Sequence, residues 1–287
     1  MPSVLEDELA KEMSCRFETA PPQDIVRWAL VESGLHRIAI ASAFQAEGTV
    51  VIHMAVRIRP DVPILFLETG FHFVETLAFK ERLAAQLGLN VVELTGDHTV
   101  ASQAAEFGER LYERDPTACC RLNKVIPFNR ALESLDAWIT SMRRDSAWTR
   151  ADTPIVSRTE LRPGKTLIRI NPIAHWRRDQ VWDYLREHEL PHNPLYDLGY
   201  ASIGCAPCTR LIYPGEDERA GRWAGLLKTE CGIHVREAQR ETASEEEQIG
   251  EERTAVRRRT ADRADAPETV PGAAISARPQ PASAHTS

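Results

Sequence analysis

The sequence contains no apolar run close to the roughly 20 residues that a membrane-spanning helix needs. Residues 1–11 are acidic and without an apolar stretch, so they do not resemble a secretory signal. Basic residues are not in excess either, because 35 Lys and Arg are present against 42 Asp and Glu, a net charge of −7. We therefore expect a cytoplasmic protein that binds neither a membrane nor nucleic acid.

The segment 235–287 lacks both aromatic residues and cysteine. It combines a run of Glu at 245–247 with a run of Arg at 257–259, and prolines interrupt its Ala- and Ser-rich end from Ala266 onward. Such a composition cannot bury a core, so we predict a charged and then Pro- and Ala-rich tail that is largely disordered. We favour a solvated tail over a partner-binding one. Before it we expect an N-terminal helical segment, 1–35, and a main domain, 36–234.

The main domain alternates short apolar runs with helical patterns. Apolar positions such as Phe79, Leu83 and Leu87 recur at four-residue spacing and predict a helix that ends near Gly88. Buried strands are predicted at 37–41, 63–67, 91–94, 137–140 and 167–170. This alternation predicts an α/β fold, a Rossmann-like, mainly parallel sheet with helices on both faces. Ligands bind such sheets beyond the carboxyl ends of the strands, so we expect the site in the loops after Ala41, Leu67 and Thr140.

The cysteines are the most informative residues of the sequence. Cys119 and Cys120 are adjacent, and Cys205 and Cys208 form a second pair far downstream. In a reducing cytosol such residues bind metals or act in catalysis more often than they form disulfides. Two tight pairs can hold a tetrahedral zinc ion or an iron–sulfur cluster. Adjacent cysteines are unusual for structural zinc, whereas a cubane offers each sulfur its own iron, so the pattern favours the cluster over zinc or over four inert buried thiols.

Several segments near these cysteines resemble, in the same order, the motifs of one known protein family. They are Cys119-Cys-Arg-Leu-Asn-Lys124-Val, Arg143-Arg-Asp145, Asn193-Pro-Leu-Tyr-Asp-Leu-Gly-Tyr200, Ser202-Ile-Gly-Cys-Ala-Pro-Cys-Thr-Arg210, Ala220-Gly-Arg-Trp223 and Lys228-Thr-Glu-Cys-Gly-Ile-His234. From about Ile38 to His234 the chain resembles the assimilatory adenylyl-sulfate (APS) reductases, the iron–sulfur branch of the phosphoadenylyl-sulfate (PAPS) reductase family. The resemblance implies an adenine nucleotide alpha hydrolase-like fold and a [4Fe-4S] cluster held by Cys119, Cys120, Cys205 and Cys208.

The segment Glu230-Cys231-Gly-Ile-His234 resembles the catalytic Glu-Cys-Gly-Leu-His of these reductases. Lys228 and His234 flank the thiol, and nearby cations favour a thiolate. The resemblance makes Cys231 the nucleophile, which attacks the sulfur of adenylyl sulfate, expels AMP and becomes an S-sulfocysteine. Thioredoxin, or glutaredoxin, then donates the electrons that release sulfite.

Substrate-binding residues are expected in several segments of the chain. Lys124, Arg219 and Arg222 match family positions that hold the sulfate and phosphate. The loop Ser42-Ala-Phe-Gln-Ala-Glu-Gly48 resembles the phosphate loop of ATP pyrophosphatases without its Lys and paired glycines, which suits a single phosphate and a ribose. The turn Glu68-Thr-Gly70 matches one that lies beside the nucleotide. The complete expected set is Ser42, Glu47, Glu68, Thr69, Gly70, Lys124, Arg143, Arg150, Arg219, Arg222 and His234.

Some positions depart from the family pattern. Gly48 replaces a usual Asp, Ala43 a commonly polar residue, Asn123 a usual Arg, and Ser146-Ala147-Trp148 a usual Gln-Ser-Pro. These changes affect the details of nucleotide binding more than the reaction. Cys15 matches no family cysteine and receives no role.

Three functions remain open on the sequence alone. The leading one is thioredoxin-dependent reduction of adenylyl sulfate by a homo-oligomer in sulfate assimilation. The second is reduction of PAPS, alone or together with APS, although members restricted to PAPS usually lack the four cluster cysteines. The third is a zinc-stabilised nucleotide-binding protein without turnover.

Overall fold

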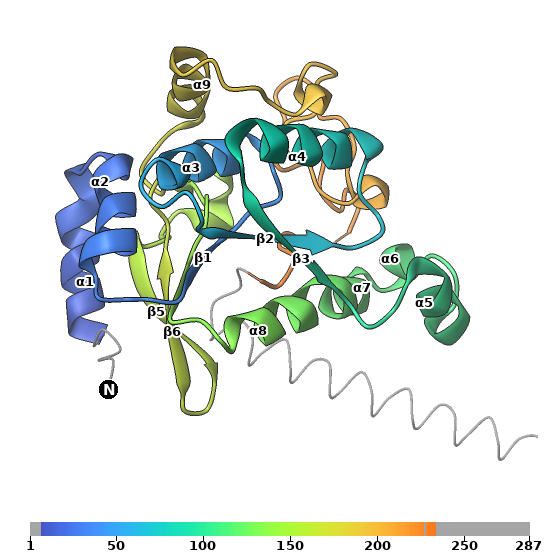
Figure 1. Cartoon of the computed structure of the whole chain (residues 1–287). Helices are drawn as coiled ribbons and strands as arrows, with labels where there is room; N and C mark the ends of the chain where they lie inside the picture. The colour runs from blue at the N-terminus through green and yellow to red at the C-terminus, as the bar shows by residue number, and fades with distance from the viewer. Residues whose placement is uncertain (1–6, 227, 234–287) are drawn as a thin grey trace, which may run out of the picture. The chain divides into compact units, whose positions relative to one another are not determined.

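The computed structural model describes residues 7–226 and 228–233. The predicted tail and His234 lie outside these residues. Within them, six strands form one sheet in the order β3-β2-β1-β4-β6-β5 (Figure 1). The neighbouring strands from β3 to β6 are parallel, and β5 is antiparallel to β6. The strands are β1 (Ile38–Ala41), β2 (Pro63–Glu68), β3 (Asn90–Thr95), β4 (Ala137–Ile139), β5 (Val156–Arg162) and β6 (Lys165–Ile170).

Helices cover both faces of this sheet, with α3 and α4 on one side and α8 on the other (Figure 1). This arrangement confirms the predicted α/β fold. The helices are α1 (Asp7–Arg16), α2 (Pro22–Arg27), α3 (Ala46–Val56), α4 (Val74–Leu87), α5 (Val100–Phe107), α6 (Leu111–Arg114), α7 (Pro116–Cys120), α8 (Ile126–Leu132) and α9 (Arg178–Glu187). Gly88 ends α4 in a left-handed conformation (φ 62°), as the sequence predicts. No helix in the described part of the chain combines the length and apolarity that a bilayer crossing needs.

Side chains of the strands alternate between two hydrophobic clusters. Ile38 and Ile40 of β1 belong to the larger cluster, with α2, α3, α4 and α9, whereas Ala39 between them faces the smaller cluster with α8. In β2, Ile64 and Phe66 join the first cluster and Leu65 the second. This period of two is the geometry of a strand that is buried on both faces. It explains why the inner strands read as continuous apolar runs in the sequence.

Strand β5 was not predicted from the sequence. It lies at the edge of the sheet and forms a hairpin with β6 through Pro163 and Gly164, where the glycine adopts φ 80°. Its side chains alternate between less and more exposed positions, and most of them are polar. An edge strand buried on one side lacks the apolar run by which the inner strands were recognised.

The N-terminal helices belong to the same core as the sheet. Ala10, Met13 and Phe17 are buried in the larger cluster. The Ser14 hydroxyl accepts a hydrogen bond from the backbone N–H of Ile155 at 2.9 Å, just before β5. Residues 7–32 therefore cover one end of the sheet rather than standing apart from it.

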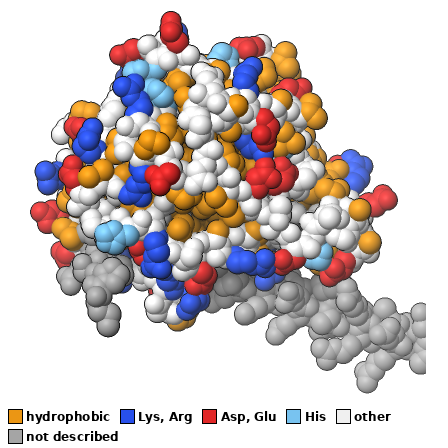
Figure 2. Space-filling view, viewed as in Figure 1, with side chains coloured by type: hydrophobic (Ala, Val, Ile, Leu, Met, Phe, Trp, Pro, Cys, Tyr) orange, Lys and Arg blue, Asp and Glu red, His pale blue; other side chains and the backbone are white. Residues whose placement is uncertain are grey.

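Charged side chains of both signs are interspersed over the face seen in Figure 2. The sheet itself has a topological switch at β1, because the chain continues from β1 to β2 on one side and returns to β4 on the other. The loops that leave β1 and β4 therefore diverge above their carboxyl ends. A crevice at that point is the usual ligand site of an open parallel sheet.

Candidate active site

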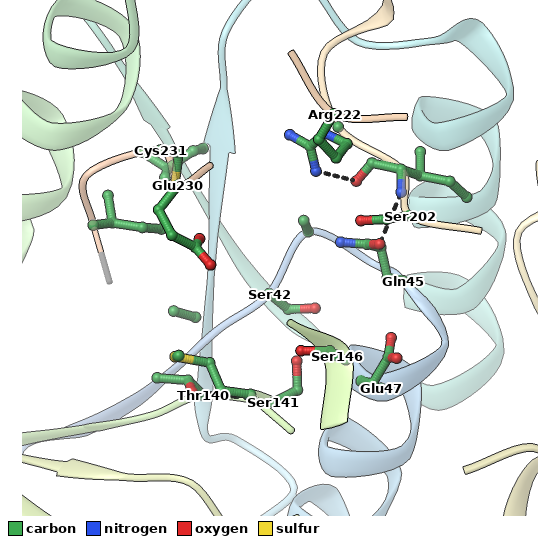
Figure 3. Close-up of a pocket in the computed structure, with 18 of the residues that line it drawn as sticks. Ser42, Gln45, Glu47, Thr140, Ser141, Ser146, Ser202, Arg222, Glu230 and Cys231 are labelled. Atoms are coloured by element: carbon green, nitrogen blue, oxygen red, sulfur yellow. Dashed lines mark hydrogen bonds between the residues drawn. The ribbon is translucent and has the colours of Figure 1, made fainter. Parts of the chain in front are cut away.

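A large pocket lies at the carboxyl ends of β1, β2 and β4. Ser42, His72 and Ser141 line it, so each of the three loops expected from the sequence contributes to the pocket. Figure 3 shows Glu230 and Cys231 on one side of this pocket and Arg222 and Gln45 on the other. The site thus combines the sheet edge with the last described segment of the chain.

The loop after β1 has a constrained backbone. Phe44 is fully buried and adopts a left-handed conformation (φ 53°), which costs energy for a residue other than glycine. The Ser42 hydroxyl accepts a hydrogen bond from the N–H of Phe44 at 3.0 Å, and the Gln45 side chain accepts one from the N–H of Ile203 at 2.9 Å. The loop is therefore held rigidly at the start of α3, where unpaired helix N–H groups favour an anion.

Packing against Ser42 explains why position 48 is a glycine. A Cβ atom at this position would collide with the hydroxyl of Ser42. The departure from the family's usual Asp therefore allows the Ser42 side chain to turn toward the first turn of α3. Any larger residue at position 48 requires Ser42 to move.

Arg143 is fully buried (0% exposed) and neutralised by three carboxylates. It donates to Glu47 at 3.1 Å, to Glu218 at 2.7 Å and to Asp145. Burial opposes its charge, yet the three acids hold the pKa of Arg143 above its usual value. Burial and the nearby Glu47 in turn raise the pKa of Glu218. The structure places the guanidinium of Arg143 on the pocket wall, already saturated with acidic partners.

Arg150 and Arg219 share a single carboxylate, that of Glu230. Arg150 binds it with both arms, at 2.7 and 2.9 Å, and Arg219 contacts it at 3.2 Å while also donating to the carbonyl of Thr229 at 3.0 Å. Burial opposes the charge of Arg150, but Glu230 holds its pKa above the usual value. Burial and the positive charge of Arg150 lower the pKa of Arg219 to about 10. These two cations have less negative charge around them than Arg143 has.

Arg222 is positioned by a short pairing between the cysteine turn and the segment 219–223. Thr209 and Arg222 form an antiparallel bridge, and the Trp223 N–H donates to the Cys208 carbonyl at 3.0 Å. The guanidinium lies 4.6 Å from the centre of the Trp223 ring and against Gly204, where any Cβ would collide with it. Trp223 is 3% exposed and therefore packs beneath Arg222.

Two of these arginines retain unused donors. The Nε atoms of Arg219 and Arg222 are buried and have no hydrogen-bond partner among residues 7–226 and 228–233. A buried donor without a partner is costly unless a ligand satisfies it. Both side chains line the large pocket, so the pocket is prepared for an anion.

A second, smaller pocket is lined by all four paired cysteines. Cys119 and Cys120 come from α7, and Cys205 and Cys208 flank a short 3₁₀ turn. Thr69 and Lys124 complete the wall, and the Thr69 hydroxyl lies 3.4 Å from the sulfur of Cys205. The structure therefore brings together the two pairs that the sequence keeps far apart.

The protonation of these thiols is uneven. Burial raises the pKa of Cys120 to about 12 and that of Cys208 to about 11. Burial also opposes the charge of Cys205, but Lys124 and Thr69 lower its pKa overall. Around Lys124, burial is outweighed by the sulfurs of Cys205, Cys120 and Cys231, so the pKa of Lys124 is raised. A metal bound there has to displace protons from most of the thiols.

The donor set fits a multinuclear cluster better than a single ion. Across the described residues, no three His, Cys, Asp or Glu side chains converge closely enough to hold one metal ion. A zinc ion needs all its sulfurs at about 2.3 Å from one point, whereas a four-iron cluster gives each thiolate its own iron. The four cysteines line one pocket, and their chemistry suits such a cluster.

Asn123, another departure from the family pattern, supports this cysteine pocket. Its side-chain amide donates to the Cys119 carbonyl at 2.9 Å and lies 3.6 Å from the Cys119 sulfur. It also donates to Gln103 at 2.5 Å. Amide groups that contact a metal-binding cysteine in this way orient its side chain and stabilise negative charge on its sulfur.

Cys231 is partly buried and lines the large pocket, within electrostatic range of Lys124, Arg150 and Arg219. Lys228, expected beside the thiol, instead donates to Thr117 at 3.2 Å on the exposed surface. The thiol therefore interacts electrostatically with Lys124, Arg150 and Arg219, which the sequence does not place beside it.

The turn Glu68-Thr69-Gly70 lies apart from the large pocket. Thr69 borders the cysteine pocket, and the Glu68 carboxylate accepts a hydrogen bond from the Gly70 N–H at 2.7 Å. The large pocket takes Leu65, Phe66 and Leu67 from β2 instead. A contact between the turn and a nucleotide stays a prediction.

Among the ionisable side chains that line the large pocket, the sequence analysis did not select His72, Glu218 and Glu230. Burial lowers the pKa of His72, whose Nε2 lies 2.8 Å from the carbonyl oxygen of Leu67. Each of the three is next to, or within two residues of, a residue that was selected. The available signal was an acidic or imidazole side chain within or beside a motif that the sequence analysis used only for its cations, its thiol or its turn.

Comparison with known proteins places this site in a defined family. The sequence model of the phosphoadenosine phosphosulfate reductase domain matches residues 37–211. An adenosine 5'-phosphosulfate reductase from Streptomyces coelicolor is 46% identical over 79% of this chain and 93% of its own. A phosphoadenosine 5'-phosphosulfate reductase from Gloeobacter violaceus is 42% identical over 78% of this chain and 93% of its own. The crystal structure of a PAPS reductase from Candida auris, a phosphate complex, superposes with a TM-score of 0.61 at 28% identity, covering 72% of this chain and 98% of that one.

Proposed function

This chain belongs to the phosphoadenosine phosphosulfate reductase family, and on that premise we propose that it reduces adenylyl sulfate to sulfite and AMP. The observation that carries the proposal is the position of Cys231, which lines the same pocket as Lys124, Arg219 and Arg222. A nucleophilic thiol beside a cluster of buried cations suits attack on an anionic sulfuryl group.

In the first half-reaction, the Cys231 thiolate attacks the sulfur of adenylyl sulfate. The bond between that sulfur and the bridging phosphate oxygen breaks, and AMP leaves with the electron pair. The unused donors of Arg219 and Arg222 support a role in binding the phosphate and sulfate oxygens. The cations thereby stabilise the charge that develops on AMP.

In the second half-reaction, a dithiol protein of the thioredoxin type supplies two electrons. Its thiolate attacks the Cys231 sulfur, sulfite leaves with the electron pair, and a mixed disulfide forms. The second thiol of the donor then attacks the donor sulfur that is bonded to Cys231. This attack releases the Cys231 thiolate and leaves the donor as an intramolecular disulfide.

We assign a [4Fe-4S] cluster to Cys119, Cys120, Cys205 and Cys208. The position of all four cysteines in the wall of one pocket supports this assignment. When bound, the cluster would join α7 to the Cys205–Cys208 turn and add to the electrostatics around Lys124. Anaerobically purified protein should contain about four iron and four sulfide per chain, and stoichiometric zinc without sulfide would contradict the assignment.

The test of the reaction compares sulfite release from APS and from PAPS with a thioredoxin system. We expect turnover of APS by the wild type and none by Cys231→Ser, with Cys15→Ser as the matched control that keeps activity. Mixed with APS in the absence of reductant, the wild type should carry one SO₃ group on Cys231 in intact-protein and peptide mass spectra. An adduct on Cys15, or turnover by Cys231→Ser, would contradict the mechanism.

Reduction of PAPS is the second candidate, because a relative at 42% identity bears that name. APS is preferred because family members restricted to PAPS usually lack the four paired cysteines that this chain has. The proposal further includes a cytoplasmic homo-oligomer with a main catalytic domain of residues 36–234. Light scattering coupled to size exclusion measures the oligomeric state.

A further inference from the structure

Glu230 directly precedes the nucleophile and occupies the centre of the cation cluster. Its carboxylate points into the pocket in Figure 3 and binds both Arg150 and Arg219. The side chains of all three residues are only 11–12% exposed. Glu230 therefore holds two cations that the proposed substrate has to approach, and the backbone links this carboxylate to Cys231.

The negative charge of Glu230 is smaller than the positive charge around it. Arg150, Arg219, Arg222 and Lys124 line the same pocket, and buried Nε donors of Arg219 and Arg222 find no partner in the part of the chain that the structure describes. A phosphosulfate brings more negative charge and more acceptor oxygens than one carboxylate. It can therefore compete for Arg150 and Arg219 and also satisfy the remaining donors.

We propose that Glu230 is a positioning residue, a carboxylate that holds Arg150 and Arg219 in the empty site and is displaced by the phosphosulfate of the substrate. The inference rests on the proposed function. Because Glu230 and Cys231 are neighbours, displacement of the carboxylate moves the thiol at the moment when the sulfur arrives. Return of the carboxylate to the two arginines then competes with bound AMP and favours its release.

The competition predicts that removal of the Glu230 charge strengthens AMP binding, whereas the loss of a merely structural ion pair would not strengthen it. Glu230→Gln keeps the shape but removes the charge that competes with the ligand. AMP should then bind about tenfold more tightly, because charge-assisted hydrogen bonds to Arg150 and Arg219 no longer have to be exchanged. Adenosine, which lacks the phosphate, should bind as it does to the wild type.

The experiment measures both dissociation constants by calorimetry on the full-length protein at low and at physiological salt. Glu133→Gln is the matched control, since Glu133 forms a similar two-armed pair with Arg162 on the exposed surface. Glu230→Asp retains the charge and should restore the wild-type affinity for AMP. In turnover, Glu230→Gln should lower both KM and kcat, because AMP leaves more slowly.

Two outcomes would overturn the inference. Unchanged or weaker binding of AMP to Glu230→Gln would mean that the carboxylate does not compete. Equal weakening of AMP and adenosine would mean that Glu230 merely supports the fold of the pocket. A different result would separate the two proposals. If Glu230→Gln binds AMP more tightly but the wild type releases no sulfite from APS, the proposed reaction is contradicted and the displacement of Glu230 is not.

Discussion

Two arginine clusters face the same pocket and differ in the balance of their charges. Arg143 is fully buried with three carboxylates, whereas Arg150 and Arg219 share Glu230 alone. The first cluster has no need of a further anion and connects α3, the loop after β4 and the segment near 218. The second retains unused donors beside Cys231. The comparison teaches that burial of an arginine does not reveal its role, which depends on how many acids already surround it.

The largest effect is expected from breaking the saturated cluster. Arg143→Ala leaves the half-buried Glu47 and Glu218 and the exposed Asp145 without their buried cation, so the free energy of unfolding should fall by about 3–5 kcal/mol. Urea unfolding followed by circular dichroism measures this loss. Arg162→Ala, which removes an exposed pair with Glu133, serves as the control and should change stability little. Equal losses in the two variants would contradict the distinction.

The unsaturated cluster should respond in binding instead of stability. Arg222→Met keeps the bulk that packs on Trp223 but removes the charge and the unused donor. We expect kcat/KM for APS to fall about 100-fold, because the substrate loses charged hydrogen bonds to the guanidinium. The midpoint of urea unfolding should change little. A variant that unfolds more easily but binds AMP normally would assign Arg222 to the fold.

A smaller effect is expected from displacing the same guanidinium without removing it. A methyl group in Gly204→Ala would occupy the space of the Arg222 side chain. AMP should bind about tenfold more weakly, because the charge remains but its direction changes. Adenosine binding is the internal control, and an equal loss for both ligands would show that the loop itself had moved.

The smallest effect is a pH dependence from the acid-rich cluster. Burial and Glu47 raise the pKa of Glu218 above its ordinary value of 4.5. The folded protein therefore binds the proton of the Glu218 carboxyl more tightly than the unfolded chain does. The stability that this proton contributes is complete below pH 4.5 and declines as the pH rises through the folded pKa of Glu218. Urea midpoints between pH 4.5 and 7 should show this decline in the wild type and a weaker one in Glu218→Gln. An identical slope in both proteins would exclude Glu218 as its source.

The sequence by itself determined the inner strands of the sheet and identified the principal residues of the candidate site. Continuous apolar runs such as 63–67 can only be buried on both faces, so they identified a parallel sheet. Because parallel strands end at one edge, the loops after Ala41, Leu67 and Thr140 could be expected at one pocket, and they line it. The paired cysteines and the Cys231 segment were found through their spacing and their resemblance to a family.

Only the tertiary structure decided which charges are saturated and which are available. Arg143 and Arg150 looked equivalent in the sequence, yet their acidic partners come from residues as distant as Glu218 and Glu230. Strand β5 likewise became visible only through its pairing with β6, because an edge strand has no continuous apolar run. Hydrophobic periodicity is local and can be read along the chain, whereas the balance of charge around a buried group depends on segments that meet only when the chain has folded.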